Sequence, residues 1–249
     1  MKHLIMKHPF YTVRRTRYAL LAATMGLLAC GSDDAVFPTS LTDGDRTYDI
    51  QIVNLTHNQP FSPAAIIAHT SGYTPFTESE AASNALEQLA EGGDNAAFIL
   101  EAQTATQYVD HATTALIAAK SASDSVTIEV PSSQTDDIKL SVVTMLVNTN
   151  DAFTGVNAAD LSDLAVSDTL IIQGPTWDAG TELNTESVGT IPGPADNGTG
   201  YVTTRDDLYD RVHIHPGVIT ADDGLSTSVL NDDHRFLNPS SRIVITRTQ

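Results

Sequence analysis

The sequence predicts a mainly β protein, an antiparallel β-sandwich with one or two short helices inserted near its N-terminal part. Short runs rich in Val and Ile recur along the chain, and Asp, Gly, Pro or Asn separate them, which favours antiparallel strands over alternating β-α-β units. A helix-forming segment lies between residues 77 and 102. With 249 residues and 41% hydrophobic content, the chain is long enough to bury the core of one sizeable domain.

The expected strands are runs of β-branched and other apolar residues. Tyr48–Leu55 alternates polar and apolar side chains, as a half-buried strand does. A loop marked by Pro60 and Pro63 follows, and Ala64–His69 is predicted to be a second, short strand. The remaining predicted strands are Ala115–Ala119, Ser125–Val130, Ile138–Val147, Thr169–Gln173, Arg211–His215 and Arg242–Thr246.

The helical segment begins with a capping-box pattern, in which Thr77 is followed three residues later by Glu80. Residues 81–90 are good helix formers, and Gly92-Gly93 is expected to end the helix. A second short helix is predicted from Asn95 to about Ala102. The Gly- and Pro-rich segment from residue 182 to 200 is predicted to be a long loop, and loops of that length tend to carry function or to move.

The N-terminal residues have the layout of an export signal. Five basic residues precede an apolar run, Tyr18–Ala29, that is shorter than the ~20 residues needed to span a bilayer. The run ends in Leu27-Leu28-Ala29-Cys30, which resembles the lipobox of bacterial lipoproteins, so Cys30 is the expected site of diacylglycerol attachment. We therefore expect a lipoprotein signal peptide at residues 1–29, a tether at 30–46 and the sandwich domain at 47–249. The alternative is an ordinary signal peptide in which Cys30 is an idle thiol.

This interpretation predicts a lipid-anchored protein of the cell envelope. The expected location is the outer membrane, with the domain facing the periplasm or the cell surface. Without the first thirty residues, eight basic residues remain against 31 acidic ones, a formal charge of −23. Such a surface repels nucleic acid and anionic lipid headgroups and attracts divalent cations. Cys30 is the only cysteine, so no disulfide can form within the domain.

A candidate cation site lies in the stretch Trp177–Glu182. Asp178 and Glu182 are four positions apart, and Gly180 between them permits backbone angles that turn both carboxylates toward one point. Asp151 follows the predicted strand Ile138–Val147 and is expected to meet them at the edge of the sandwich. Two carboxylates held together repel each other, and a bound cation removes that cost. From spacing alone, the default interpretation is that these are solvated loop acids in a very acidic protein.

The order of these motifs resembles the spondin N-terminal domain family, particularly its bacterial members. The likeness spans residues 48–247 and rests on Asn150-Asp151-Ala152-Phe153-Thr154-Gly155, Trp177–Glu182, Gly193-Pro194 and His215-Pro216-Gly217. The resemblance implies a non-enzymatic antiparallel sandwich that holds one calcium ion (Ca²⁺) through Asp151, Asp178 and Glu182. Vertebrate relatives commonly have an aspartate in place of Glu182 and a tryptophan in place of Ala152. Calcium suits such a site because it accepts 6–8 oxygen ligands in irregular geometry.

The resemblance implies an adhesion or partner-binding role, with an unknown envelope or extracellular protein or glycan as the partner and no nucleic acid. One alternative is an envelope metalloenzyme, because His213 and His215 on a strand would project both imidazoles to one face. A carbohydrate-binding sandwich with structural calcium is another. His234 near Asp232 and Asp233 suggests a hydrolase, but no nucleophile motif accompanies it.

Overall fold

The computed structural model describes residues 44–249, so the signal peptide, Cys30 and most of the tether lie outside the described residues. The domain is mainly β, as predicted. Its strands are β1 (Arg46–Asn54), β2 (Ala65–Thr70), β3 (Tyr108–Thr113), β4 (Val126–Val130), β5 (Ile138–Met145), β6 (Ala152–Asp160), β7 (Thr169–Gly174), β8 (Thr176–Asp178), β9 (His213–Ile214) and β10 (Ser241–Arg247). The helices are α1 (Asn84–Gly92) and α2 (Ala96–Thr104), and three 3₁₀ turns lie at Ser132–Asp137, Ala221–Asp223 and Asp232–His234.

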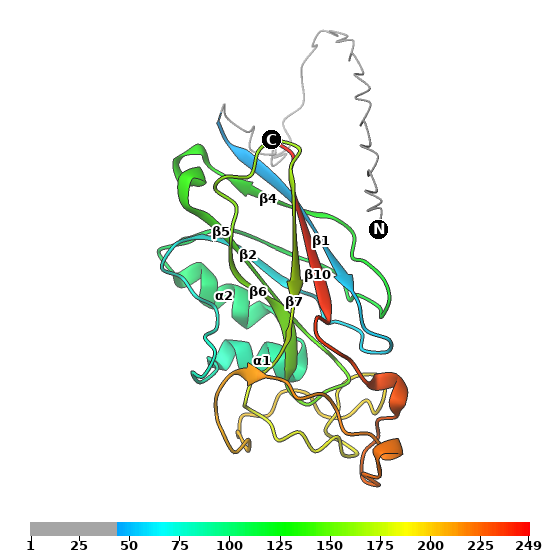
Figure 1. The fold of residues 1–249 in the computed structure, drawn as a ribbon. Coiled ribbons are helices and arrows are strands. Elements are labelled where there is room, and N and C mark those ends of the chain that lie inside the picture. Colours follow the sequence, from blue (N-terminus) through cyan, green and yellow to red (C-terminus); the bar gives the residue numbers. More distant parts are fainter. Residues whose placement is uncertain (1–43) are drawn as a thin grey trace, which may run out of the picture. The chain divides into compact units, whose positions relative to one another are not determined.

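Two antiparallel sheets form the sandwich (Figure 1). One has four strands in the order β4-β1-β10-β7, and the other has six in the order β3-β2-β5-β6-β8-β9. The core between them is mainly aliphatic and includes Ile50 and Ile52 of β1, Ile66 of β2, Leu140 of β5 and Ile245 of β10. The confirmed alternation in β1 follows from this packing, because its inward residues meet the second sheet and its outward residues face water.

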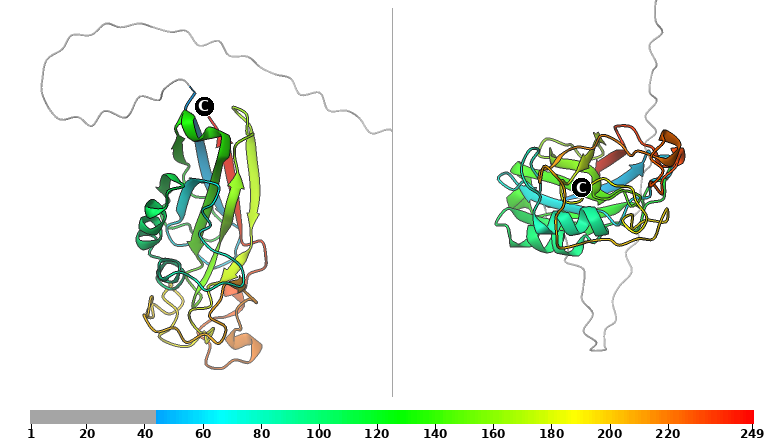
Figure 2. Two further views of the ribbon diagram at one scale, coloured as in Figure 1. Left: turned by 90° about the vertical axis from the view of Figure 1, so that its left-hand side faces the viewer. Right: turned by 90° about the horizontal axis from the view of Figure 1, so that it is seen from below.

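The six-stranded sheet is covered on both faces (Figure 2). Its outer face packs against α1 and α2, through a second core that includes Ile67 of β2, Leu86 and Leu89 of α1, and Phe153 of β6. Strand β2 is therefore buried along nearly its whole length, with no alternation. Continuous burial explains why its sequence is a run of apolar residues.

The structure corrects several details of the predicted elements. The N-cap of α1 is Ser83, whose Oγ accepts a hydrogen bond from the Leu86 N–H, and the Thr77 capping box is not used. Residues 115–119 form no strand and contribute one isolated bridge, between Ile117 and Phe61. The strand predicted at residues 211–215 has only two residues, His213–Ile214.

Three strands were not predicted: β3, β6 and β8, the last of which has only three residues. Strand β3 has half-buried residues on both faces and so lacks the alternation that marks a strand. Strand β6 begins at Ala152, directly after the turn-rich segment at residues 148–151, and Gly155 within it does not favour a strand. Asp151, which was expected to follow a strand, is therefore the residue immediately before β6.

Strand β1 starts and β10 ends at one end of the domain, and the long loops lie at the other. Tyr48 at the start of β1 pairs with Arg247 near the C-terminus, whereas the β5–β6 turn and the segment between β8 and β9 lie at the opposite end (Figure 1). Residues 179–212, which include the predicted loop, contain no helix or strand. Within the described residues, no helix has the length and apolar character needed to cross a membrane.

Candidate metal centre

Strand pairing brings Asp151 and Asp178 to the loop end of the six-stranded sheet. In the antiparallel ladder of β6 and β8, Ala152 lies opposite Asp178, and Asp151 is the residue immediately before Ala152. The Ala179 N–H donates to the Asp151 carbonyl at 3.2 Å and extends the pairing by one step. The predicted strand before Trp177, Thr169–Gln173, is β7 in the other sheet, and the short strand β8 carries Asp178 to its place beside Asp151.

Asp151 is fully buried and only half satisfied. Its Oδ2 accepts hydrogen bonds from the Thr181 N–H at 2.8 Å, the Glu182 N–H at 3.1 Å and the Thr181 hydroxyl at 3.3 Å. Its Oδ1 is buried and has no hydrogen-bond partner among the described residues. A buried carboxylate oxygen without a donor is costly, so this atom is suited to meeting a cation.

The turn after Asp178 aims the backbone donors at Asp151. Gly180 adopts a left-handed φ of +70°, and a Cβ there would collide with the backbone of Arg211. The Gly180 N–H donates to Asp178 Oδ1 at 2.8 Å, which closes a turn over the end of β8. A glycine is therefore required at this position for both its backbone angle and its close approach to Arg211.

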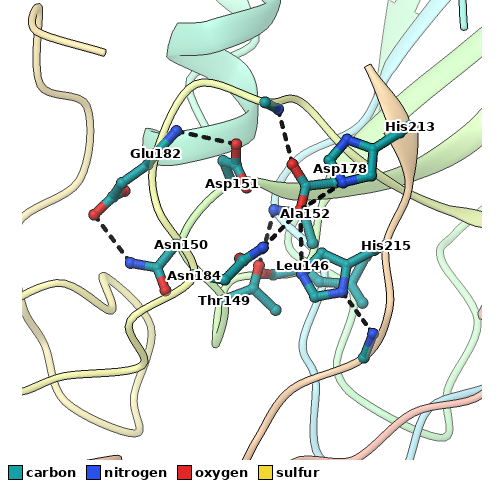
Figure 3. A network of polar contacts seen from close by, with 12 residues as sticks. Leu146, Thr149, Asn150, Asp151, Ala152, Asp178, Glu182, Asn184, His213 and His215 are labelled. Atoms are coloured by element: carbon teal, nitrogen blue, oxygen red, sulfur yellow. Dashed lines mark hydrogen bonds and ion pairs between the residues drawn. The ribbon is translucent and has the colours of Figure 1, made fainter. Parts of the chain in front are cut away.

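Asp178 is also fully buried and is surrounded by nitrogen groups. Its Oδ2 accepts a hydrogen bond from Asn184 Nδ2 at 2.6 Å. The same oxygen lies 3.8 Å from His213 Nε2 and 4.0 Å from His215 Nε2. Both imidazoles of the predicted pair thus face one carboxylate (Figure 3).

Glu182 lies on the other side of Asp151. Its Oε1 accepts a hydrogen bond from Asn150 Nδ2 at 3.0 Å, and its side chain extends toward Asn150 and away from Asp178 (Figure 3). Across residues 44–249, no group of three or more His, Cys, Asp and Glu side chains is arranged to hold a metal ion. The three predicted residues therefore share one loop cluster, but their carboxylates do not converge on one point in this conformation.

Burial raises the pKa of all three carboxylates. Desolvation is the main cause at Asp151, and the negative charge of Asp178 adds to it. Burial likewise raises the pKa of Asp178, against the hydrogen bond from Asn184, and raises that of Glu182 to about 7. Burial therefore penalises the charged form of each carboxylate, and a bound cation would relieve that penalty.

The hydrogen bonds of the two histidines define their tautomers. The Gly217 N–H donates to His215 Nδ1 at 2.9 Å, so the ring proton of neutral His215 sits on Nε2, facing Asp178. Burial lowers the pKa of His215 to about 3, which keeps the ring neutral. His213 Nδ1 donates to the Arg211 carbonyl at 3.0 Å. Because Nε2 of His215 carries a proton and offers no lone pair, this arrangement disfavours the two-histidine metal site.

Three further residues support the cluster and were not predicted to do so. Asn150 and Asn184 hold the carboxylates of Glu182 and Asp178. Glu91, at the end of α1, is buried and accepts a hydrogen bond from the Val202 N–H at 2.9 Å. A sequence signal existed for Glu91, because Glu87 and Glu91 are spaced by four on the same helix face as the apolar residues.

The family follows from a comparison with known proteins. The family model described as Spondin_N matches residues 51–190, more than half of the chain. The chain belongs to the spondin N-terminal domain family. The predicted resemblance is thereby confirmed, and the matched segment contains Asp151, Asp178 and Glu182 but neither His213 nor His215. No curated protein matches the chain.

Membership of the spondin N-terminal family defines the general class of the protein. The family domain is an extracellular, adhesion-type module, and it is non-catalytic. The matched segment begins within β1 and ends in the long loop after β8.

Proposed function

We propose that this spondin-type domain is a non-enzymatic, calcium-binding module of the cell envelope that binds a protein or glycan partner. The observation that supports calcium most directly is the buried Oδ1 of Asp151, which has no donor among the described residues and lies beside a second buried carboxylate, Asp178. Carboxylate oxygens on loops are the ligands that calcium prefers, and calcium tolerates irregular geometry.

Asp151, Asp178 and Glu182 would hold the ion, with backbone carbonyls and water completing its shell. Glu182 is half-buried and would have to exchange its hydrogen bond with Asn150 for the ion. The ion would supply positive charge that links the β5–β6 turn to the segment at residues 179–212, which has no helix or strand of its own. Its role is therefore structural, since it would hold loops in place for partner binding.

The proposed anchor agrees with this arrangement. A lipid on Cys30 would attach the domain through the tether that precedes β1, and β1 starts at the end of the domain opposite the candidate centre. The loop end would then be the part of the domain free to meet a partner in the periplasm or outside the cell. The strong negative charge of the chain supports attraction of divalent cations to this end.

Thermal unfolding with calcium and with a chelator tests the metal proposal. A ligand that binds only the native state at about 100 times its Kd adds about 2.7 kcal/mol of stability. For a domain of this size, that gain corresponds to a rise in Tm of roughly 5–10 °C. Asp178→Asn should remove most of this rise, because it deletes one of the two buried charges that the ion would neutralise.

The matched control is Asp163→Asn, which makes the same change of charge at an exposed site on the β6–β7 loop. This variant should keep the full calcium-dependent rise in Tm. An unchanged Tm of the wild-type protein on adding calcium would refute the calcium proposal. Metal analysis of the purified protein separates it from the histidine-based alternative, which requires bound zinc or copper.

A further inference from the structure

A cavity of about 600 Å³ lies beside the candidate centre. Three segments that are far apart in the sequence form its walls: the start of the loop after β1, the turn after β9 and the segment before β10. Its lining residues are Leu55, Thr56, His57, Pro216, Gly217, Val218, Arg235, Phe236, Leu237, Asn238 and Pro239. This volume is within the range of sites that hold small organic ligands.

The apolar part of the lining is partly open to water. Leu55 is 39% exposed and Leu237 is 87% exposed, although both are large aliphatic residues. Phe236 is half-buried and its ring packs against that of His215, with the centroids 5.4 Å apart. Apolar surface left uncovered at the rim of a cavity favours a ligand with an apolar body.

The polar part of the lining is unusual for so acidic a chain. The chain has 31 acidic residues, yet no Asp or Glu is among the residues that line this cavity in the described part of the chain. Arg235 and His57 line it instead. Both are paired with carboxylates outside the lining, because His57 Nε2 lies 3.5 Å from Asp233 Oδ1 and Arg235 contacts Asp223 and Asp232.

Two of the lining side chains retain hydrogen-bond donors. Asn238 uses its Oδ1 to accept from the Thr176 N–H at 2.7 Å, so its amide Nδ2 remains as a donor. Arg235 is held by Asp232 at Nε and by Asp223 at Nη2, and its Nη1 has no hydrogen bond within residues 44–249. The carboxylates of Asp223 and Asp232 fix the guanidinium from outside the cavity and weaken its charge without filling its donor set.

We propose that this cavity binds a small organic carboxylate with an apolar body. The apolar body would contact Leu55, Phe236 and Leu237, and the carboxylate would accept hydrogen bonds from Arg235 and Asn238. The open Nη1 of Arg235 and Nδ2 of Asn238 are both donors, and they match a carboxylate better than a cation or a neutral donor. This site is separate from the calcium proposal, because none of Asp151, Asp178 and Glu182 lines the cavity.

Calorimetric titration of the full-length purified chain tests the proposal with 4-phenylbutyrate as the probe and 4-phenylbutyramide as its uncharged analogue. The carboxylate should bind in a saturable manner, and the amide should bind at least about tenfold more weakly. Both titrations are run with calcium and with chelator. Binding of the carboxylate in both conditions is expected, and this result distinguishes the cavity from the metal centre.

Two pairs of variants localise the binding. Leu237→Asp places a negative charge at the cavity and should weaken 4-phenylbutyrate binding about tenfold or more. Its control is Leu208→Asp, at a leucine that is 81% exposed and outside the cavity, and it should bind as the wild type does. Arg235→Gln should also weaken binding, with Arg242→Gln, on the exposed side of β10, as its control.

Several outcomes would overturn the proposal. Equal affinity for the acid and the amide would mean that the donors do not select a carboxylate. Absence of saturation with 4-phenylbutyrate at millimolar concentration would mean that the cavity is not a site for this class. Equal effects of Leu237→Asp and Leu208→Asp would place the binding elsewhere, and Tm measurements on each variant identify any loss of folding.

Discussion

At the scale of single residues, the loop end is organised around Asp151 and the turn that covers it. Three donors from Thr181 and Glu182 converge on one oxygen of Asp151, while its other oxygen is buried without a donor among the described residues. The donors reach Asp151 because Gly180 bends the chain where the backbone of Arg211 leaves no room for a side chain. The geometry of the carboxylate therefore depends on a residue that carries no functional group.

Replacing Gly180 tests this dependence. Gly180→Ala combines a left-handed φ with a collision against the Arg211 backbone, and it should reduce the free energy of unfolding by about 2 kcal/mol or more. Gly189→Ala is the control, because Gly189 has a similar φ of +88° and open space around its Cβ position. Its expected cost is about 1 kcal/mol. Urea unfolding of both proteins gives the comparison, and equal losses would show that crowding by Arg211 has no role.

Titration of Glu182 gives a second prediction at this scale. Burial raises its pKa from 4.5 to about 7, so the folded state holds a proton that the unfolded state has released across this interval. The stability of the calcium-free protein should therefore fall as pH rises from about 5 to about 7. Glu182→Gln removes the titrating group, so its Tm should decrease less than that of the wild type as pH rises through this interval.

The wild-type protein has a second source of pH dependence, its large negative charge, which also destabilises the folded state as pH rises. The measurement to compare is therefore the slope of Tm against pH, for the wild type and for Glu182→Gln, in metal-free buffer. Parallel pH profiles for the two proteins would contradict the assigned role of Glu182. Added calcium should flatten the wild-type profile, since the ion stabilises the charged form.

At the scale of elements, α1 joins the outer face of the six-stranded sheet to the loop end. Leu86 and Leu89 pack into the core under the sheet. On the same helix, Glu87 binds Arg205 with an N–O distance of 2.9 Å, and Glu91 accepts from Val202. The helix thereby holds the segment around residues 200–205, which has no regular structure, against the folded sheet.

The N-cap of α1 provides the test at this scale. Ser83→Ala removes the side-chain acceptor of the Leu86 N–H and should cost about 1 kcal/mol, or a decrease in Tm of roughly 2–4 °C. Ser226→Ala serves as the control, because Ser226 is exposed and its side chain makes no hydrogen bond within the described residues.

Thr77→Ala should give no loss of stability, since Thr77 is not the cap that the helix uses. A loss at Thr77 equal to that at Ser83 would contradict the cap assignment.

At the scale of the whole domain, the two ends of the sandwich differ in what they carry. One end carries the start of β1 and the end of β10, where Tyr48 pairs with Arg247. The other end gathers the buried carboxylates, the cavity and the long loops. In the proposed envelope setting, anchoring at one end leaves the other available for a partner, and the proposed calcium would keep its loops in one conformation.

The sequence alone determined the fold class, most strands, the two helices and the family, because these depend on local periodicity, on turn residues and on a motif order that can be read along the chain. It also predicted that Asp151, Asp178 and Glu182 lie in one loop cluster. In the structure, the register of β6 against β8 places Asp151 beside Asp178. Tertiary structure decided what no local pattern encodes. It separated the 169–173 strand from β6 into different sheets, set the direction of the Glu182 side chain, and fixed the His215 tautomer through Gly217. These features depend on which distant segments pack together, since burial and hydrogen-bond partners arise only once the sheets have formed.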